Sequence, residues 1–436
     1  MNKSELIRLS IAQIGFVLTY NILTMNFQSY FVKTAFAGDP FANTLAFTVV
    51  TIAFGVGALI YLVAGWLSDK TVTRWGKRYP YLLFSIFGAI AFILLGLNFY
   101  PISMYLLLIL LACLATIYTV TYRLSYTSYW SLYMDLTKPE DRVKSAITFN
   151  LFGLIGVAIA LIIPIPPEIV EPTSYSYFNI TLIAGLVYIA AILFVFFFGP
   201  KENVEEIRKQ HALKTEQPSL LSSITGTLKD ENFRRYAISA FFASIFYYMA
   251  MFILKPFIEW KTEGRTPPIQ IDFMFILIML LPVALIIFYF CNWASKRWGK
   301  RTMYKRGTLV GFIAFPVLTL LAVQGDSISL VIQLIILITV MLSVVVIMLS
   351  YQNAILMDIT PKGKEATYSA VFFFITVIPI PIASAIAGPV LDIFTFDVVG
   401  FWIGQDFAYV ILILIMSLAL FVSFLFLRRV RYQEVV

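Results

Sequence analysis

The sequence predicts an all-α membrane protein whose twelve transmembrane helices form two homologous six-helix bundles. Hydrophobic residues make up 60% of the 436-residue chain and charged residues only 13%, which excludes a soluble domain, where about a quarter of residues are charged. The apolar residues fall in blocks that approach or exceed the roughly 20 residues that a spanning helix needs. Finally, the pentapeptide RWGKR occurs twice, at 74–78 and 297–301, which indicates an internal duplication.

A second pair of matching stretches supports the duplication. MDLT at 134–137 and MDIT at 357–360 are separated by the same 223 residues as the two pentapeptides. Only one long hydrophilic stretch, 201–232, interrupts the apolar blocks, with six blocks on either side of it. We therefore expect an N-terminal bundle at 1–200, a cytoplasmic linker at 201–232 and a C-terminal bundle at 233–436.

Each apolar block is expected to be one helix, because backbone groups in lipid must be satisfied within the segment. The expected spans, in chain order, are about 10–32, 43–67, 80–99, 102–133, 145–165, 177–199, 234–257, 271–293, 306–324, 328–350, 366–390 and 404–427.

The distribution of basic residues predicts the orientation of these helices. If the N-terminus lies inside, the inner segments hold 27 of the 32 Lys and Arg residues, and the outer loops hold four. Positive charge favours the cytoplasmic side, so we expect a multi-pass protein of the cell membrane with both termini in the cytoplasm and both RWGKR copies at inner loops.

Several other classes of protein are disfavoured. The basic residues lie in short inter-helix loops rather than on one domain surface, so no nucleic-acid partner is expected. No Cys–His, Ser–His or metal-ligand cluster appears at reachable depth, so we expect neither an enzyme nor a metal site. The expected partners are a small-molecule solute and the lipid bilayer, and we expect a monomer.

One basic residue lies deep in a predicted span. Arg123 precedes Asp135 by 12 residues, which is roughly 18 Å along a helix, so it lies near the middle of the membrane. Charges at this depth are costly and usually functional. Arg123 either binds an anionic or polyhydroxylated substrate, the interpretation we favour, or bonds carbonyls and hydroxyls at a helix contact.

Polar and aromatic side chains form stripes on three of the predicted helices, and such stripes should face a partner helix or a wet cavity. Aromatic rings beside amide and guanidinium donors suit a sugar, whose CH faces stack while its hydroxyl groups need hydrogen bonds. The stripes consist of Gln13, Tyr20, Asn21, Thr24 and Gln28 on the first helix; Thr116, Thr119, Tyr122, Arg123, Tyr126, Trp130 and Tyr133 on the fourth; and Ser244, Tyr248, Met251 and Lys255 on the seventh.

Three stretches carry a resemblance to a known family: GWLSDKTVTRWGKRYPYLL (65–83), YWSLYMDLTKPEDR (129–142), and helix 11 from EATYSAVFFF (365–374) to ASAIAGPVL (383–391). They resemble the major facilitator superfamily, and within it the glycoside–pentoside–hexuronide:cation symporters and the related sucrose transporters. The resemblance implies the major facilitator fold and alternating access around a central site.

The resemblance also implies roles for particular residues. A latch on the cytoplasmic face corresponds to Asp69, Arg74, Lys77 and Arg78, and the repeated helix-end acids Asp135 and Asp358 suggest a shared gating or capping role. Arg142 and Glu365 lie in the matching stretches at the same face. Trp130 corresponds to an aromatic residue that stacks on sugar in the melibiose-type symporters.

The sequence departs from the family at its cation and sugar sites. Tyr61, Gly57 and Tyr126 stand where the family has acids, Asn150 where it has an arginine, and Thr376 where it has a lysine. Sodium coupling is therefore unsupported. We expect no cofactor; a coupling cation, if there is one, is more readily a proton than sodium.

The sequence thus predicts a secondary transporter that moves a sugar, glycoside or related organic solute across the cytoplasmic membrane by alternating access, with cation (proton) symport as one mode of coupling. An exporter of amphipathic compounds or lipids, and a transport-inactive membrane sensor, are the alternatives. The residues expected to contact substrate are Arg123, Trp130, Tyr126, Asn21, Gln28, Tyr20, Thr24, Asn150 and Tyr248.

Overall fold

The computed structural model describes the chain in twelve ranges, almost all of them helical. The ranges are 3–36, 38–97, 99, 102–136, 142–162, 174–205, 207–208, 220–262, 273–323, 327–361, 365–395 and 404–431. Within them the side chains of some residues, including Gln28, Asp69 and Asp135, are not described. The described residues contain helices and turns and no β-strand.

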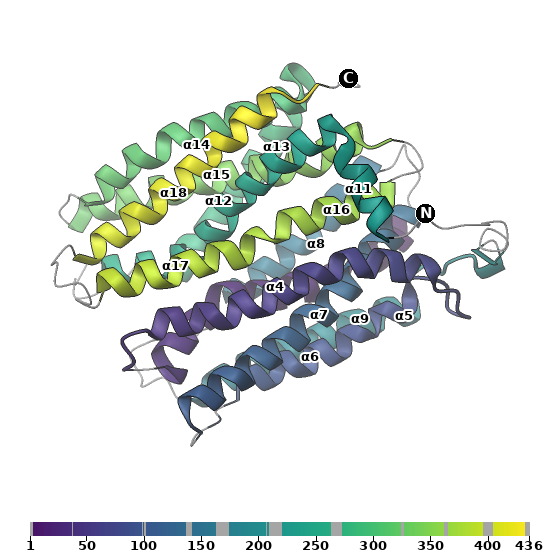
Figure 1. The fold of residues 1–436 in the computed structure, drawn as a ribbon, viewed down its shortest axis with the longest axis horizontal. Helices are drawn as coiled ribbons and strands as arrows, with labels where there is room; N and C mark the ends of the chain where they lie inside the picture. Colours follow the sequence, from purple (N-terminus) through teal and green to yellow (C-terminus); the bar gives the residue numbers. More distant parts are fainter. Residues whose placement is uncertain are drawn as a thin grey trace. The chain divides into compact units, whose positions relative to one another are not determined.

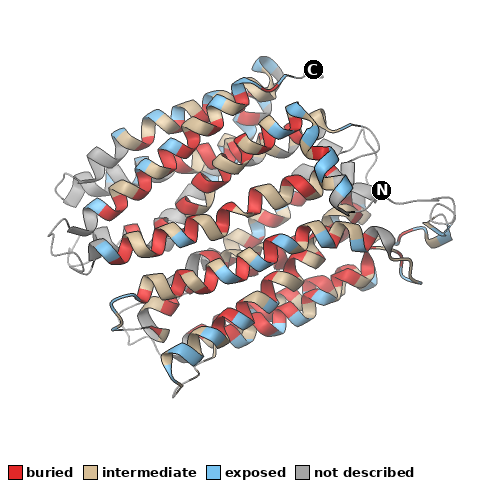
Figure 2. Ribbon diagram, viewed as in Figure 1, coloured by how far each residue is buried: buried red, intermediate tan, exposed pale blue. Residues whose placement is uncertain are grey.

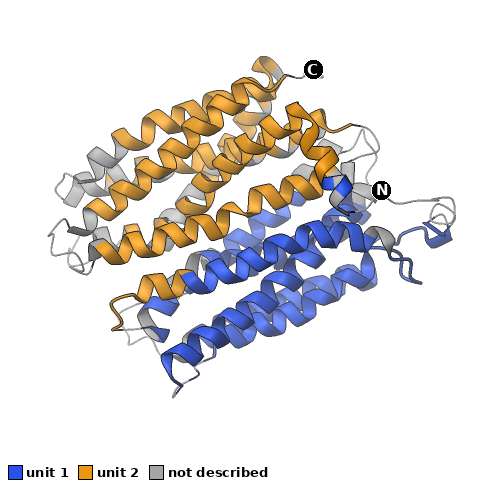
Figure 3. Ribbon diagram, viewed as in Figure 1, with its two compact units in different colours: residues 1–37, 48–224 blue, residues 38–47, 225–436 orange. Residues whose placement is uncertain are grey.

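The helices divide between two compact units, coloured separately in Figure 3. Unit 1 comprises residues 1–37 and 48–224, and unit 2 comprises residues 38–47 and 225–436. The division within the linker region, between 224 and 225, lies inside a short helix, α11 (Leu220–Lys229). A long helix, α4 (Ala42–Lys70), is also divided, because its first residues make their contacts in unit 2 and the rest in unit 1.

Unit 1 contains the N-terminal helices (Figure 1). In chain order these are α1 (Lys3–Ser10), α2 (Ala12–Asn21), the π-helix η1 (Ile22–Asn26), α3 (Phe27–Tyr30), the π-helix η2 (Phe31–Ala35), most of α4, α5 (Tyr79–Leu82), α6 (Phe84–Leu95), α7 (Met104–Leu136), α8 (Arg142–Ile162) and α9 (Ser174–Phe198).

Unit 2 contains the C-terminal helices. They are α12 (Glu231–Thr262), α13 (Phe273–Trp298), α14 (Lys300–Val323), α15 (Ser327–Ile359), α16 (Glu365–Val377), α17 (Pro379–Thr395) and α18 (Gly404–Arg428).

The described helices follow the predicted spans and confirm the fold class. Eight helical segments of the described chain are long and apolar enough to cross a membrane: Ser4–Thr24, Ala42–Ser68, Met104–Tyr133, Tyr177–Phe198, Glu231–Ile253, Thr339–Leu356, Tyr368–Ile393 and Phe407–Arg428. Three shorter apolar helices, Tyr79–Leu95, Thr148–Ala160 and Leu285–Ser295, lie in the predicted third, fifth and eighth spans. Helix α14 occupies the predicted ninth span.

Three predicted spans are less regular than one continuous α-helix; one is the third, which is divided at Leu83 between α5 and α6. The first contains two π-helical turns, η1 and η2. The eleventh is divided at Ile378, where α16 ends and α17 begins with Pro379. Proline has no backbone N–H and its ring hinders the preceding turn. A helix break is therefore expected immediately before Pro379.

Each unit has its own core, in which buried faces alternate with exposed ones along the helices (Figure 2). In unit 1, α2 packs against α8 and α9, and α6 packs against α7 and α9. In unit 2, α18 packs against α12 and α14. Gly15 shows how close the α2–α9 contact is, because a Cβ atom there would lie 2.8 Å from the backbone of Tyr188.

Candidate functional site

The Arg123 guanidinium lies inside unit 1, in a box of aromatic rings from three helices. Its side chain is 4% exposed, and Nη1 donates a hydrogen bond of 2.5 Å to the hydroxyl of Tyr61 on α4. The Cζ atom lies 5.0 Å from the ring centre of Tyr61, 5.2 Å from Tyr122, 5.4 Å from Tyr20 and 5.6 Å from Phe54. These separations are within the range of cation–π attraction.

The aromatic rings around Arg123 offset part of the free-energy cost of burying its positive charge. Each cation–π contact contributes about 0.5–1 kcal/mol at exposed sites and about 2 kcal/mol when water is excluded. The hydrogen bond from Arg123 to Tyr61 adds a polar partner across the α7–α4 contact. Unit 1 therefore holds a positive charge within an aromatic lining.

Two residues predicted to bind substrate belong to this arrangement. Tyr20 on α2 stacks on Tyr122 at 5.8 Å between ring centres. Tyr126 stacks on the other side, 5.5 Å from Tyr122 and nearly parallel to it at 13°. Phe16 of α2 packs edge-on against Tyr126 at 5.2 Å. Tyr20, Tyr122 and Tyr126 thus form a continuous stack beside Arg123.

Trp130 belongs to a neighbouring aromatic cluster instead. It stacks on Tyr133 at 6.0 Å and 14° and meets Phe149 of α8 edge-on at 4.8 Å. It is half-buried. The structure places it about two helical turns along α7 from Arg123, so any molecule that contacts both residues must extend along the helix.

The polar residues of the first helix are engaged with their own backbone. Asn21 donates through Nδ2 to the carbonyl of Val17 at 2.8 Å. Thr24, which is buried, donates through its hydroxyl to the carbonyl of Tyr20 at 2.9 Å. Both residues border or lie in the π-helical turn η1. Side chains that bond to the preceding turn in this way support an irregular helix.

The remaining predicted substrate residues are dispersed. Asn150 on α8 is exposed. Tyr248 lies on α12 in unit 2, half-buried and edge-on to Tyr247 at 4.9 Å. The side chain of Gln28 lies outside the described residues.

The first RWGKR copy forms a compact turn closed by an acid that we did not predict. The buried Arg78 donates through its backbone N–H to Oε2 of Glu202 at 2.9 Å, and its guanidinium donates to Ser68. Gly76 has φ = +102°, a conformation that glycine adopts without strain. Glu202 is buried against the turn, and its position in the second residue of the charged linker gave no sign of this role.

The other members of the predicted latch are only partly described. Arg74 is exposed and its guanidinium lies 4.7 Å from the ring centre of Trp75, and Lys77 is half-buried. The side chains of Asp69, Asp135, Arg142 and Glu365 lie outside the described residues, so the pairing of Asp69 within the latch stays a prediction.

The second RWGKR copy has different partners. Lys300 forms an ion pair of 3.1 Å with Asp358 on α15, so the repeated pentapeptide and the repeated helix-end acid meet in unit 2. Arg301 donates through Nη2 to the backbone carbonyl of Arg428 at 2.9 Å. Gly299 has φ = +79°, as the matching Gly76 does in the first copy.

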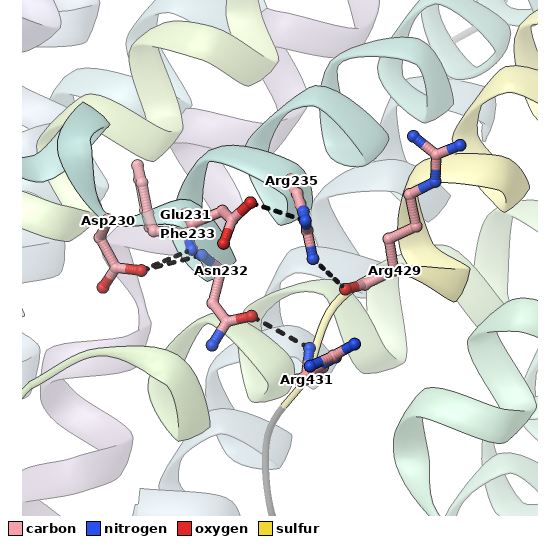
Figure 4. Close-up of polar contacts among 7 residues, drawn as sticks. All are labelled: Asp230, Glu231, Asn232, Phe233, Arg235, Arg429 and Arg431. Carbon is pink, nitrogen blue, oxygen red and sulfur yellow. Dashed lines mark hydrogen bonds and ion pairs between the residues drawn. The ribbon is translucent and has the colours of Figure 1, made fainter.

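The chain that follows α18 is fastened to the start of α12 (Figure 4). Arg235 pairs with Glu231 at 2.6 Å and donates to the carbonyl of Arg429 at 2.9 Å. The backbone N–H of Arg431 donates to Oδ1 of Asn232 at 3.1 Å. Asp230 caps the same helix, accepting bonds from the first backbone N–H groups. These contacts provide, in unit 2, the fastening that Glu202 provides in unit 1.

A further carboxylate, which we did not predict as a site, is enclosed at the beginning of α4. Asp392 on α17 is 1% exposed. Its Oδ1 accepts from the side chain of Asn43 at 2.8 Å and from its backbone N–H at 3.3 Å. Its Oδ2 accepts from the backbone N–H of Thr44 at 2.6 Å and from its hydroxyl at 2.5 Å. Asp392 thus supplies an N-terminal cap from another helix.

No group of three or more His, Cys, Asp or Glu residues that could hold a metal ion occurs in the part of the chain that the structure describes. Cys113 and Cys291 are both free thiols.

Comparison with known proteins supports a transporter. The family model described as MFS/sugar transport protein matches residues 9–434. Among solved structures, a variant of the nucleoside transporter NupG has a TM-score of 0.68 at 14% identity, covering 97% of this chain and 99% of its own. A D-xylose-proton symporter has a TM-score of 0.65 at 13% identity, covering 95% and 96%.

A POT family transporter in complex with a thioalcohol conjugated peptide has a TM-score of 0.69 at 13% identity, covering 98% of this chain and 96% of its own. At such identities the structures establish the fold and not the cargo. No curated protein matches the sequence. The family match extends over nearly the whole chain, and this protein therefore belongs to the MFS/sugar transport protein family, as a secondary transporter of the major facilitator fold.

Proposed function

We propose that this transporter moves a sugar, glycoside or related organic solute, and that Arg123 with its tyrosine neighbours forms the unit 1 side of the substrate site. The observation that carries the proposal is the guanidinium at mid-helix depth inside the ring box of Tyr20, Phe54, Tyr61 and Tyr122. A charge so placed is expensive to maintain in a membrane, and a substrate contact explains why it is kept.

The chemistry of the box suits a polyhydroxylated substrate. A guanidinium has five N–H donors in a planar fork, and the Tyr61 hydroxyl that bonds to it fixes one edge of that fork. The half-buried ring of Tyr126, which stacks on the buried Tyr122, is the apolar face proposed for the CH groups of a sugar ring. Trp130 extends the aromatic surface along α7 for a second sugar or an aglycone.

Orientation and coupling belong to the same proposal. The basic residues favour a cell-membrane protein with both termini in the cytoplasm. The residues at the family's cation positions do not favour sodium, since one of them, Tyr61, is bonded to Arg123; a proton is the preferred coupling ion. Because the buried Arg123 is positively charged, it suits an anionic solute, which would balance that charge. Its N–H donors also suit a neutral sugar.

The experiment is ligand binding and uptake by purified, reconstituted protein. A thermal-shift screen with sugars, uronates and organic acids first identifies a stabilising ligand. We then expect Arg123→Gln to weaken that ligand at least tenfold and Tyr61→Phe to weaken it less, because the latter removes only one hydrogen bond to the guanidinium.

The matched control is Tyr129→Phe on the same helix. The Tyr129 hydroxyl donates to the carbonyl of Leu9 at 2.7 Å, so this variant loses a buried hydrogen bond away from Arg123. It should unfold at a lower temperature with the ligand affinity unchanged. Wild-type affinity and uptake in a correctly inserted Arg123→Gln protein would remove Arg123 from the site.

Alternating access also gives the Asp392 contact a role. Before substrate can enter from that end of the molecule, the start of α4 must leave α17, which breaks the bonds from Asn43 and Thr44. We therefore propose that Asp392 holds this end closed. Charge-assisted hydrogen bonds of this kind contribute about 1.5–3 kcal/mol each.

Cysteine labelling tests the role of Asp392. Ala46 is fully buried next to the contact, so Ala46→Cys, in a protein with Cys113 and Cys291 replaced by serine, reports opening to a membrane-impermeant maleimide. Adding Asp392→Ala should speed labelling at least fivefold. Adding Asp230→Ala, which removes the cap of α12, should not. Equal rates with and without Asp392 would exclude it as the closing contact.

A further inference from the structure

Two arginines of unit 2 converge on one tryptophan where α13 gives way to α14. Arg297 and Trp298 are the last two residues of α13, and Arg306 lies in the second turn of α14. The Cζ atoms of Arg297 and Arg306 lie 5.9 Å and 5.6 Å from the Trp298 ring centre. Trp293 completes the cluster, edge-on to Trp298 at 5.4 Å and 5.7 Å from Arg297.

This Arg297–Trp298–Arg306 cluster lies at the end of two exposed apolar stripes. On α13 the exposed side chains leading to it include Ile286 and Tyr289, and on α14 they include Val310 and Ile313, all more than half exposed. In a membrane-spanning helix such side chains lie against acyl chains. Both stripes therefore lead from the hydrocarbon to the cluster.

Comparison with the first copy shows that the extra charge is specific to unit 2. At the offset of 223 residues, Lys305 and Arg306 correspond to Leu82 and Leu83. Leu83 is half-buried in unit 1, whereas its counterpart Arg306 is exposed. The second copy therefore carries two basic residues where the first carries leucines, and one of them, Arg306, lies beside Trp298.

The acids beside the two copies also have different partners. In unit 1 the acid Glu202 is buried against the pentapeptide turn. In unit 2 the acid Asp358 pairs with Lys300, and within the described residues neither Arg297 nor Arg306 forms an ion pair with a carboxylate. Two guanidinium groups thus remain available at the surface.

We propose that Arg297, Trp298 and Arg306 bind the phosphate headgroup of an anionic phospholipid. Guanidinium groups match phosphate oxygens in geometry and charge, and tryptophan prefers the level of the headgroups and glycerol. The apolar stripes account for acyl chains, which a free phosphate ion lacks. The cluster includes part of the second RWGKR copy, which is expected at the inner loop between the eighth and ninth predicted spans, so the lipid belongs to the leaflet with the anionic surface potential.

The test measures lipids retained by the purified full chain. Protein is equilibrated with detergent micelles containing equal phosphatidylglycerol and phosphatidylcholine, and the bound lipids are counted by native mass spectrometry. We expect the wild type to retain phosphatidylglycerol at least fivefold over phosphatidylcholine, and Arg297→Gln with Arg306→Gln to bring that ratio close to one.

The matched control removes two exposed arginines elsewhere, Arg74→Gln with Arg234→Gln, and should keep the preference. An unchanged ratio in the Arg297/Arg306 double variant would overturn the proposal. An equal loss of the phosphatidylglycerol preference in the control would also overturn it, because the net charge of the protein alone would then explain the preference. Displacement of phosphatidylglycerol by millimolar inorganic phosphate would also overturn it, in favour of a small-anion site. None of these outcomes depends on which solute is transported.

Discussion

The same five residues, RWGKR, close a turn in each unit but are fastened in different ways. In unit 1 the turn is closed from the linker by the buried carboxylate of Glu202, which accepts the backbone N–H of the buried Arg78. In unit 2 the matching Arg301 donates to a backbone carbonyl of Arg428, and the charge contact is a partly exposed pair between Lys300 and Asp358.

The difference shows which features of the duplicated turn are set by the pentapeptide. Gly76 and Gly299 both have positive φ, so the backbone path follows from the repeated glycine. Glu202 and Arg428 come from outside the repeated motifs, after the sixth and twelfth predicted spans, whereas Asp358 belongs to the repeated MDIT stretch. The first copy makes a buried polar contact with Glu202, whereas the second copy has a partly exposed ion pair between Lys300 and Asp358.

The strongest test of this comparison is Gly76→Ala. An alanine at this position would have to adopt a positive φ, which costs about 1–3 kcal/mol. Its Cβ atom would also lie 2.7 Å from Cδ of Glu202 and collide with Oε2. We expect a loss of about 3 kcal/mol in the free energy of unfolding, the upper end of the conformational range, measured by unfolding of the purified protein.

Gly38→Ala is the control for the collision. Gly38 has φ = +81°, and a Cβ atom there meets nothing within 4 Å, so only the conformational cost of about 1–3 kcal/mol applies. Adding Glu202→Ala to Gly76→Ala should restore part of the stability, since it removes the collision. If the two glycine variants are equally destabilised and Glu202→Ala restores nothing, Glu202 does not close the turn.

Much of the fold was predictable because its determinants are local. The lengths of the apolar blocks and the repeated motifs indicated the helices, and the structure confirms the fold class. The breaks within helices were harder to predict: α17 begins at a proline, Pro379. Neither η1 nor η2 contains proline, so these π-helical turns left no local mark in the sequence.

The polar sites were less accessible to sequence reasoning, because their partners are distant in the chain. Arg123 was predicted from its depth alone, and Tyr61 was singled out only as a departure from the family pattern, yet the two are bonded. Glu202 and Asp392 are separated from their partners by 124 and 349 residues. A carboxylate at a helix end looks solvated in sequence, and only packing reveals that it is buried.

A smaller effect is expected in the second copy. Lys300 and Asp358 keep 33% and 16% of their side-chain surface exposed, so solvent and salt screen their attraction, and such pairs contribute about 0–1 kcal/mol. A double-mutant cycle of Lys300→Gln and Asp358→Asn should give a coupling energy in that range that falls with added salt. The pair Arg235–Glu231, more exposed on the glutamate side at 62%, should give less. A coupling energy above about 2 kcal/mol that does not change with salt would contradict this expectation. It would show that a buried contact of the acid closes the second turn, as in the first copy. The two copies would then differ only in which acid makes the contact.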